Sequence, residues 1–100
     1  MPEIARFYGI VMNHPKVRSV QVLDPHTLAV AFDNNIQKRY DIRPLLEKEM
    51  FAPLANYALF KSVRVEPGGW AVSWSNAIDL SEHELWSRGQ TIVEHQEDEK

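Results

Sequence analysis

Residues 17–42, VRSVQVLDPHTLAVAFDNNIQKRYDI, repeat the alternation of a β-strand across two turn signals. Its central segment, residues 27–33, places large apolar side chains at alternate positions, namely Leu28, Val30 and Phe32. This is the period of a strand with one buried face. The flanking segments, residues 17–23 and 36–42, are β-branched or alternate in the same way. The sequence therefore predicts a meander of three antiparallel strands.

Two short polar segments separate these strands. Asp24-Pro25-His26 contains a proline suited to the second position of a turn, and Asp33-Asn34-Asn35 contains asparagines, which tolerate positive φ. Lys38 falls on the apolar face of the third strand. We therefore expect its stem to be covered and its ammonium to reach water.

Prolines and a capping signal predict three short helices in the second half of the chain. Pro44 suits the first helical position of residues 44–50. Residues 51–60 predict a second helix, entered at Pro53, with one face formed by Leu54, Ala58 and Leu59. In residues 81–88, Ser81-Glu82-His83-Glu84 fits a capping box, and we expect Gly89 to end the helix as a left-handed residue.

A second hairpin is predicted between these helices. Residues 62–66 and 70–75 alternate on either side of Pro67-Gly68-Gly69. The fold class is therefore α+β, an antiparallel sheet made of the three-strand meander plus this hairpin, with short helices packed on one face. We expect a single domain over residues 12–89, an N-terminal extension over residues 1–11, and a disordered acidic tail over residues 90–100.

The composition of the chain excludes several classes of function. The chain has 100 residues, 44% of them hydrophobic, no cysteine and a net charge of -3. Residues 1–88 hold ten basic and ten acidic side chains, so the whole imbalance lies in the tail. Without cysteine there is no disulfide framework and no thiol chemistry. We expect a cytoplasmic protein, because the sequence shows neither a membrane-spanning stretch nor a signal peptide.

The sequence gives little sign of chemistry. The histidines lack the spacing of a metal site, so we expect neither metal nor cofactor: His14, His26, His83 and His95. The aspartates at strand ends and before helices suit turns and caps: Asp24, Asp33, Asp41 and Asp79. The enzyme hypothesis would need Asp41, Arg43 and Asp79 to converge on one pocket. We predict no catalytic residues and keep the enzyme as an alternative.

Tryptophan and arginine mark the candidate interface instead. Three tryptophans in so short a chain suit either a small core or a partly exposed interface anchor. We expect Trp70 and Trp74 to share one face of the second hairpin and Trp86 to pack on them. Arg39 and Arg43 complete the candidate interface. The zero net charge of residues 1–88 argues against binding nucleic acid without a partner.

Five blocks of the chain resemble a small bacterial family of uncharacterised proteins, the domain-of-unknown-function family twenty-four forty-two. They are MNHPKVRSV, then FDN with RYDIRPLLE, then FAPL, ALFKSVRVEPGGWAVSW and NAIDLSEHELW. Two turns depart from the family pattern, since Ala77-Ile78 stand where Gly-Ala is usual, and Asn56-Tyr57 where Asp-Pro is common. The opening MPEIARFYGIV resembles a second uncharacterised family, number forty-one sixty, whose members begin M-P-x-I-x-R-F-Y-G-I.

These resemblances imply a function by association. Members of the two families are often encoded side by side, and the pair is regarded as toxin–antitoxin-like. The resemblance implies a non-catalytic protein-interaction module, an antitoxin-like partner of a small protein encoded nearby. A regulatory domain related to DNA-binding proteins is a second hypothesis, because some relatives carry a DNA-binding helical segment after this domain. Neither family's catalytic role is established, so no site residue is carried over.

Overall fold

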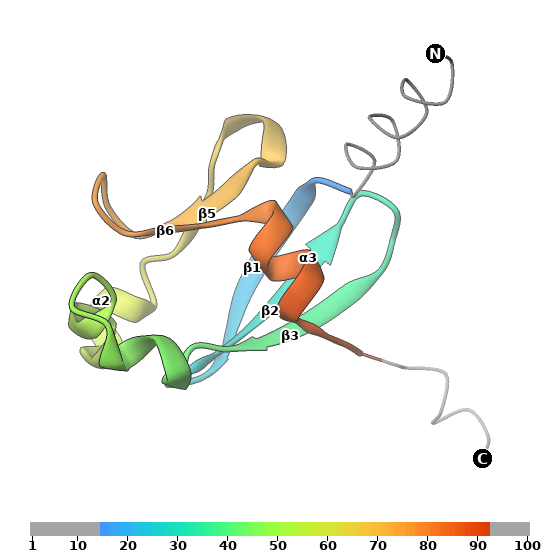
Figure 1. The fold of residues 1–100 in the computed structure, drawn as a ribbon. Coiled ribbons are helices and arrows are strands. Elements are labelled where there is room, and N and C mark those ends of the chain that lie inside the picture. Colours follow the sequence, from blue (N-terminus) through green and yellow to red (C-terminus); the bar gives the residue numbers. More distant parts are fainter. Residues whose placement is uncertain (1–14, 93–100) are drawn as a thin grey trace, which may run out of the picture.

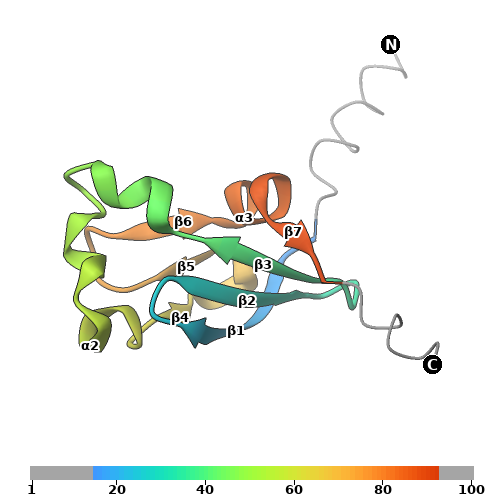
Figure 2. The same ribbon diagram turned by 90° about the horizontal axis from the view of Figure 1, so that it is seen from below.

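The meander predicted from residues 17–42 forms in the computed structural model, which describes residues 15–92. Strands β1 (Val17–Asp24), β2 (Thr27–Phe32) and β3 (Gln37–Asp41) pair antiparallel in sequence order (Figures 1 and 2). A two-residue strand that the sequence did not predict, β7 (Gln90–Thr91), extends this sheet beyond β3. The α+β class with antiparallel strands is thus confirmed.

Side chains hold the turns of the meander as expected from their residue types. The backbone N–H of His26 donates to Oδ1 of Asp24 at 3.0 Å. In the following turn, the N–H of Ile36 donates to Oδ1 of Asn34 at 3.0 Å, and Asn35 takes a φ of +72°. Asparagine accepts this left-handed conformation at low cost, which fixes the register of β2 against β3.

The predicted second hairpin forms a separate sheet with one more strand. β4 (Arg64–Val65) pairs antiparallel with β5 (Ala71–Ser73) across the turn η3 (Pro67–Gly69). The unpredicted β6 (Asp79–Ser81) pairs with the other side of β5. Strands of two or three residues are too short to show a period in the sequence.

The segment between the sheets forms short turns of helix rather than the two helices predicted. η1 (Arg43–Glu47) and η2 (Ala52–Ala55) are 3₁₀ helices, each with a proline in its first turn, and α2 (Tyr57–Phe60) is a single α-turn. They gather at one end of the molecule (Figures 1 and 2). Leu54 is buried and Leu59 half-buried, as the predicted apolar face requires, but Ala58 is exposed and Phe60 is buried, because the chain breaks at Asn56 between η2 and α2.

The closing helix α3 (Glu82–Arg88) begins as predicted and ends differently. The Ser81 hydroxyl accepts the N–H of Glu84 at 3.1 Å, the first half of the capping box. Gly89 has φ -74° and ψ 158°, so the prediction of a left-handed residue is wrong. The chain instead passes extended into β7, and a Cβ on Gly89 would lie 2.6 Å from the carbonyl oxygen of Leu85. A close approach of backbone, and not a left-handed turn, explains the glycine.

The core lies between the two sheets, with α3 packed on β3 and β6. The residues with no exposed surface come from both sheets and from the segments joining them: Leu28, Phe32, Ile42, Leu54, Phe60, Val72 and Leu85. Lys38 lies on the apolar face as predicted, and its ammonium donates to the carbonyl of Trp86 at 2.6 Å. Within residues 15–92, no helix is long and apolar enough to cross a membrane.

Candidate functional site

A pocket of about 550 Å³ opens where β3 runs past the end of β7. Residues 39–41 of β3 form one wall, and the others come from η1, from α3 and from Gln90. We call it the arginine pocket, after the three arginines that line it, Arg39, Arg43 and Arg88. The sequence predicted Arg39 and Arg43 as interface residues, but not Arg88. Glu84, Arg88 and Gln90 lie some fifty residues further along the chain, and no local signal linked them to β3.

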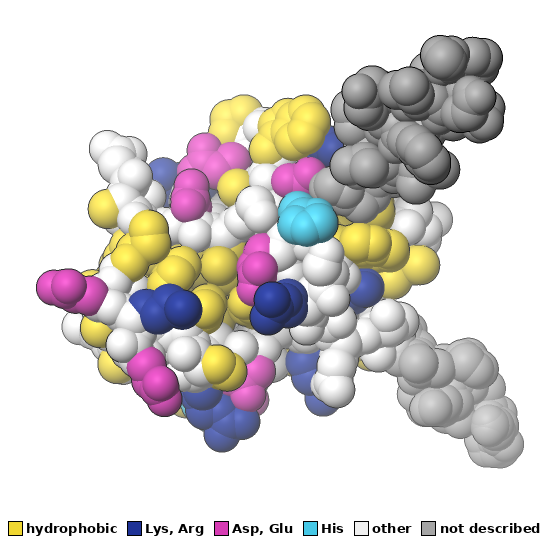
Figure 3. Space-filling view, viewed as in Figure 1, with side chains coloured by type: hydrophobic (Ala, Val, Ile, Leu, Met, Phe, Trp, Pro, Cys, Tyr) yellow, Lys and Arg dark blue, Asp and Glu magenta, His cyan; other side chains and the backbone are white. Residues whose placement is uncertain are grey.

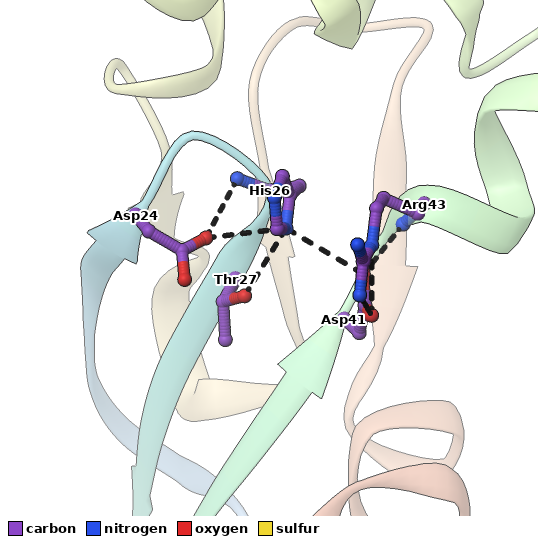
Figure 4. Close-up of polar contacts among 5 residues, drawn as sticks. All are labelled: Asp24, His26, Thr27, Asp41 and Arg43. Carbon is purple, nitrogen blue, oxygen red and sulfur yellow. Dashed lines mark hydrogen bonds and ion pairs between the residues drawn. The ribbon is translucent and has the colours of Figure 1, made fainter.

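Asp41 and Arg43 neutralise one another at the edge of this pocket (Figure 4). The guanidinium of Arg43 donates from Nη2 to Oδ2 at 2.7 Å and from Nε to both carboxylate oxygens at 3.1 Å. The backbone N–H of Arg43 donates to Oδ1 at 2.9 Å, a turn contact over two residues, while the N-cap of η1 is Ile42 and carries no side-chain cap. These bonds hold the pKa of Asp41 below its usual range. The carboxylate therefore stays ionised with its oxygens occupied.

His26 links the first turn of the meander to the end of β3 (Figure 4). Its Nδ1 lies 3.2 Å from Oδ1 of Asp24, 3.9 Å from Oδ1 of Asp41 and 3.4 Å from the hydroxyl of the buried Thr27. The backbone bond from His26 lowers the pKa of Asp24, so that carboxylate is also ionised at neutral pH. This cluster braces the loop that supports one wall of the arginine pocket.

Tyr40 and Glu84 join β3 to α3 across the pocket wall. The Tyr40 hydroxyl donates to Oε2 of Glu84 at 2.7 Å. Burial and this bond raise the pKa of Tyr40 above its usual range, so it remains a neutral donor. The capping box predicted that Glu84 reaches back to the N–H of Ser81, but its carboxylate is used by Tyr40 instead.

Arg39 and Arg88 are left as the accessible cations of the pocket. Both are exposed, and within residues 15–92 neither guanidinium has a hydrogen-bond or ion-pair partner. The three arginines and two carboxylates lining the pocket give it a net charge of +1. Outside it the charges are mixed, since Figure 3 shows acidic and basic side chains interspersed on the face that carries α3.

The three tryptophans lie apart, so the predicted packing of Trp86 on the other two is wrong. Trp74 is 4% exposed, stacks on Phe60 and donates its Nε1–H to that residue's carbonyl at 2.9 Å. Trp86 packs edge-on against Phe32. Trp70 is 59% exposed. The alternation that places Trp70 and Trp74 on one face fails because Trp70 precedes β5 and belongs to the turn.

Trp70 is exposed, but contacts on both its ring and its backbone hold it in place. The ammonium of Lys16 lies 3.9 Å from its ring centroid, and its carbonyl accepts the N–H of Glu82 at 2.9 Å. The connection from β4 to β5 that carries it lies at the opposite side of the molecule from β3 (Figure 1). Of the five predicted interface residues, Trp70 is thus exposed and Arg39 and Arg43 line the arginine pocket, whereas Trp74 is buried and Trp86 packs against Phe32.

The residues of the enzyme hypothesis do not meet in one place. Asp41 and Arg43 line the arginine pocket, whereas Asp79 lines an adjoining pocket of about 390 Å³. No three metal-binding side chains come together in the part of the chain that the structure describes. Of the histidines, His26 lies in a turn and His83 on the exposed side of α3, while His14 and His95 lie outside the described residues.

Comparison with known sequences and structures gives one match. The sequence model of a family described as "Protein of unknown function (DUF2442)" matches residues 17–91. This range contains both sheets, the arginine pocket and Trp70. No curated protein and no solved structure matches the chain. The resemblance of residues 1–11 to a second family lies outside both the match and the described residues.

Proposed function

The chain belongs to the DUF2442 family, and from this premise we propose that it is a non-catalytic protein-interaction module of the bacterial cytoplasm. Its partner is a small protein encoded nearby, toward which it acts as an antitoxin. The observation that carries the proposal is the exposed and well-positioned Trp70. Tryptophan and arginine are the residue types most enriched among those that dominate protein–protein binding energy.

The surface around Trp70 explains why binding a protein would be favourable. A tryptophan buries about 150–250 Å² when fully covered, and 59% of Trp70 is still exposed. At about 25 cal/mol per Å², covering the rest contributes about 3 kcal/mol. Lys16 and the backbone bond from Glu82 already restrict the ring and its backbone, so little freedom is lost on binding.

Co-expression with the product of the adjacent gene tests the proposal. We expect a complex that co-elutes in size-exclusion chromatography, and we expect Trp70→Ala to weaken it at least tenfold. Tyr57→Ala is the matched control, because Tyr57 is also exposed and also lies under a lysine, Lys61, at 4.8 Å. Separate elution of the two proteins, or equal affinities of Trp70→Ala and the parent chain, would refute the interaction at this surface.

The antitoxin role needs its own measurement. The adjacent gene product, expressed alone in the native host, should slow growth, and co-expression of this chain should restore it. Trp70→Ala should restore growth less well than Tyr57→Ala. A partner that binds without inhibiting growth would leave the interaction module standing and remove the antitoxin role.

A further inference from the structure

We propose that the arginine pocket binds an acidic segment of the partner protein. One carboxylate of that segment lies on Arg39 and Arg88, and the main chain beside it lies on the open edge of β3. This inference rests on the proposed function and adds the chemistry of the partner. It concerns a surface on the side of the molecule away from Trp70, so the two surfaces can be tested separately.

The edge of β3 is open at the pocket. The N–H of Ile42 donates to the carbonyl of His26 at 2.9 Å, so the adjacent residues Thr27 and Asp41 form a non-hydrogen-bonded pair between β2 and β3. In such a pair the backbone groups of both residues point away from each other. The N–H and C=O of Asp41 therefore face the side of β7, which pairs only with Lys38 and Arg39. Among residues 15–92, no strand lies opposite Asp41 on that side.

The charges of the pocket favour a single carboxylate. Arg43 already neutralises Asp41, and Glu84 is held by the hydroxyl of Tyr40, so Arg39 and Arg88 remain to bind an anion. One carboxylate brings the lining from its net charge of +1 to zero, whereas a dianionic phosphate would leave an excess of negative charge. Guanidinium groups match carboxylate oxygens in pairs, which adds directionality to the attraction.

The shape of the region favours an extended segment over a free ion. Leu45, Glu84 and Arg88 line both the arginine pocket and the adjoining one, so the two are continuous along α3. Half-buried Leu45 lies where the aliphatic stem of a bound glutamate would pack. Further along, Lys48 supplies another cation in the adjoining pocket. A peptide can thus place a carboxylate on the arginines and continue toward Lys48.

Titration of the full chain with blocked peptides tests the pocket directly. The probe is Gly-Glu-Gly-Glu-Gly, its control is Gly-Gln-Gly-Gln-Gly, and amide shifts in NMR report the position. We expect the glutamate peptide to shift the amides of Arg39, Asp41 and Gln90. We expect Arg39→Gln and Arg88→Gln each to weaken its binding at least fivefold. Arg18→Gln, an equal loss of charge on β1, should leave the affinity within twofold.

Three results would overturn the assignment. Equal binding of the glutamine peptide would show that no carboxylate is recognised. Equal shifts from inorganic phosphate at the same concentration would show a site for free anions. A tenfold gain in peptide affinity on removal of residues 93–100, which hold four acidic side chains, would make the chain's own end the occupant.

The complex with the partner separates this inference from the proposed function. If Arg39→Gln and Arg88→Gln weaken the co-purified complex at least tenfold, both stand. If the complex forms and the arginine variants leave it unchanged, the interaction module stands and the acidic-segment inference falls. If no adjacent gene product binds, the proposed function falls, and the assignment of the pocket to that partner falls with it.

Discussion

The two sheets of this protein are stabilised in different ways. β1 and β2 have eight and six residues and are joined to their neighbours by turns that their own side chains hold. β4, β5 and β6 have only two or three residues each. The smaller sheet depends on contacts from outside it, such as the bond from Trp74 Nε1–H to the carbonyl of Phe60. Local alternation encodes the larger sheet, and tertiary contacts hold the smaller one.

Both candidate interaction surfaces lie where the regular structure of these sheets stops. The arginine pocket opens where β7 ends and leaves β3 uncovered, and Trp70 projects from the turn before β5. Backbone and side-chain groups that a longer strand would have paired are exposed at such places. We therefore expect substitution of single buried side chains in or beside the smaller sheet to lower the free energy of unfolding strongly. Substitutions in the arginine pocket or at Trp70 should change it much less.

Trp74→Ala should have the largest effect on stability. The side chain is almost fully buried, so its removal leaves a cavity and takes from the carbonyl of Phe60 its shorter hydrogen bond, leaving the one from Val63 N–H at 3.4 Å. We expect a loss of about 3–5 kcal/mol in the free energy of unfolding, measured by urea denaturation. Trp70→Ala is the control and should cost no more than about 2 kcal/mol, because 59% of its side chain is already exposed and only the covered part and the contact with Lys16 are lost. Equal losses of unfolding free energy in the two variants would show that the buried Trp74 stabilises the protein no more than the exposed Trp70.

The same contrast explains how much of the fold the sequence predicted. β1, β2 and β3 follow from alternation, and the cap at Ser81 follows from its residue type. β6 and β7 are too short to show a period, and their pairing depends on distant residues. The prediction of a left-handed Gly89 is wrong because the chain passes extended into β7, and the small side chain is needed for the close approach to the carbonyl of Leu85 in α3.

The candidate site was predicted only in part, for a physical reason. Arg39 and Arg43 were recognisable as a basic cluster on β3 and just after it. Arg88 joins them because α3 packs on β3, a contact that no local pattern encodes. The sequence likewise could not show that Trp74 turns inward while Trp70 stays exposed, because the positive φ values at Gly68 and Gly69 set where β5 begins.

Gly69→Ala should lower stability through a contact between the two sheets, because Gly69 lies where the turn η3 meets β1. Its φ is +74°, and an added Cβ would lie 2.4 Å from the backbone carbonyl oxygen of Val17. Strain at positive φ and the displaced backbone together should cost about 2–4 kcal/mol in unfolding free energy. At Gly68 the φ is +81°, but the added Cβ would meet only the exposed ring of Trp70.

Gly68→Ala is therefore the matched control and should cost only about 1–2 kcal/mol, mostly the strain at positive φ, because the Trp70 ring within 2.9 Å of the added Cβ is exposed and can shift. Urea denaturation of the two variants side by side measures the difference. A Gly68 variant that is as unstable as the Gly69 variant would mean that the turn matters only for its own conformation, and that its contact with β1 adds nothing.

Raising the pH should weaken the link between β3 and α3. The pKa of Tyr40 is raised by burial and by its bond to Glu84, so the folded state keeps a proton that the unfolded state releases above about pH 10. The stabilisation is complete below that pH and is lost as the pH rises toward the folded-state pKa. The slope is at most about 1.4 kcal/mol per pH unit, the contribution of one proton.

Tyr40→Phe should remove this pH dependence, and Tyr57→Phe, at an exposed tyrosine, should preserve it. Tyrosinate absorbance gives an independent check, because a late-titrating tyrosine should be present in the parent chain and absent from Tyr40→Phe. If the parent chain and the Tyr40 variant lose stability in parallel above about pH 10, then Tyr40 does not carry the linkage.

Removing residues 1–11 should have the smallest effect on the free energy of unfolding. It tests whether the larger sheet is stable without the N-terminal extension. The family match begins at Val17, and the buried core residues found within residues 15–92 all belong to the matched range. We therefore expect the truncated chain to unfold within about 1 kcal/mol of the parent. A larger loss would mean that the apolar residues of the extension, Phe7, Tyr8 and Ile10, pack as an additional strand. The outer edge of β1, which pairs with no strand among residues 15–92, would be the place for it, and the larger sheet would then also depend on a contact that its own alternation does not encode.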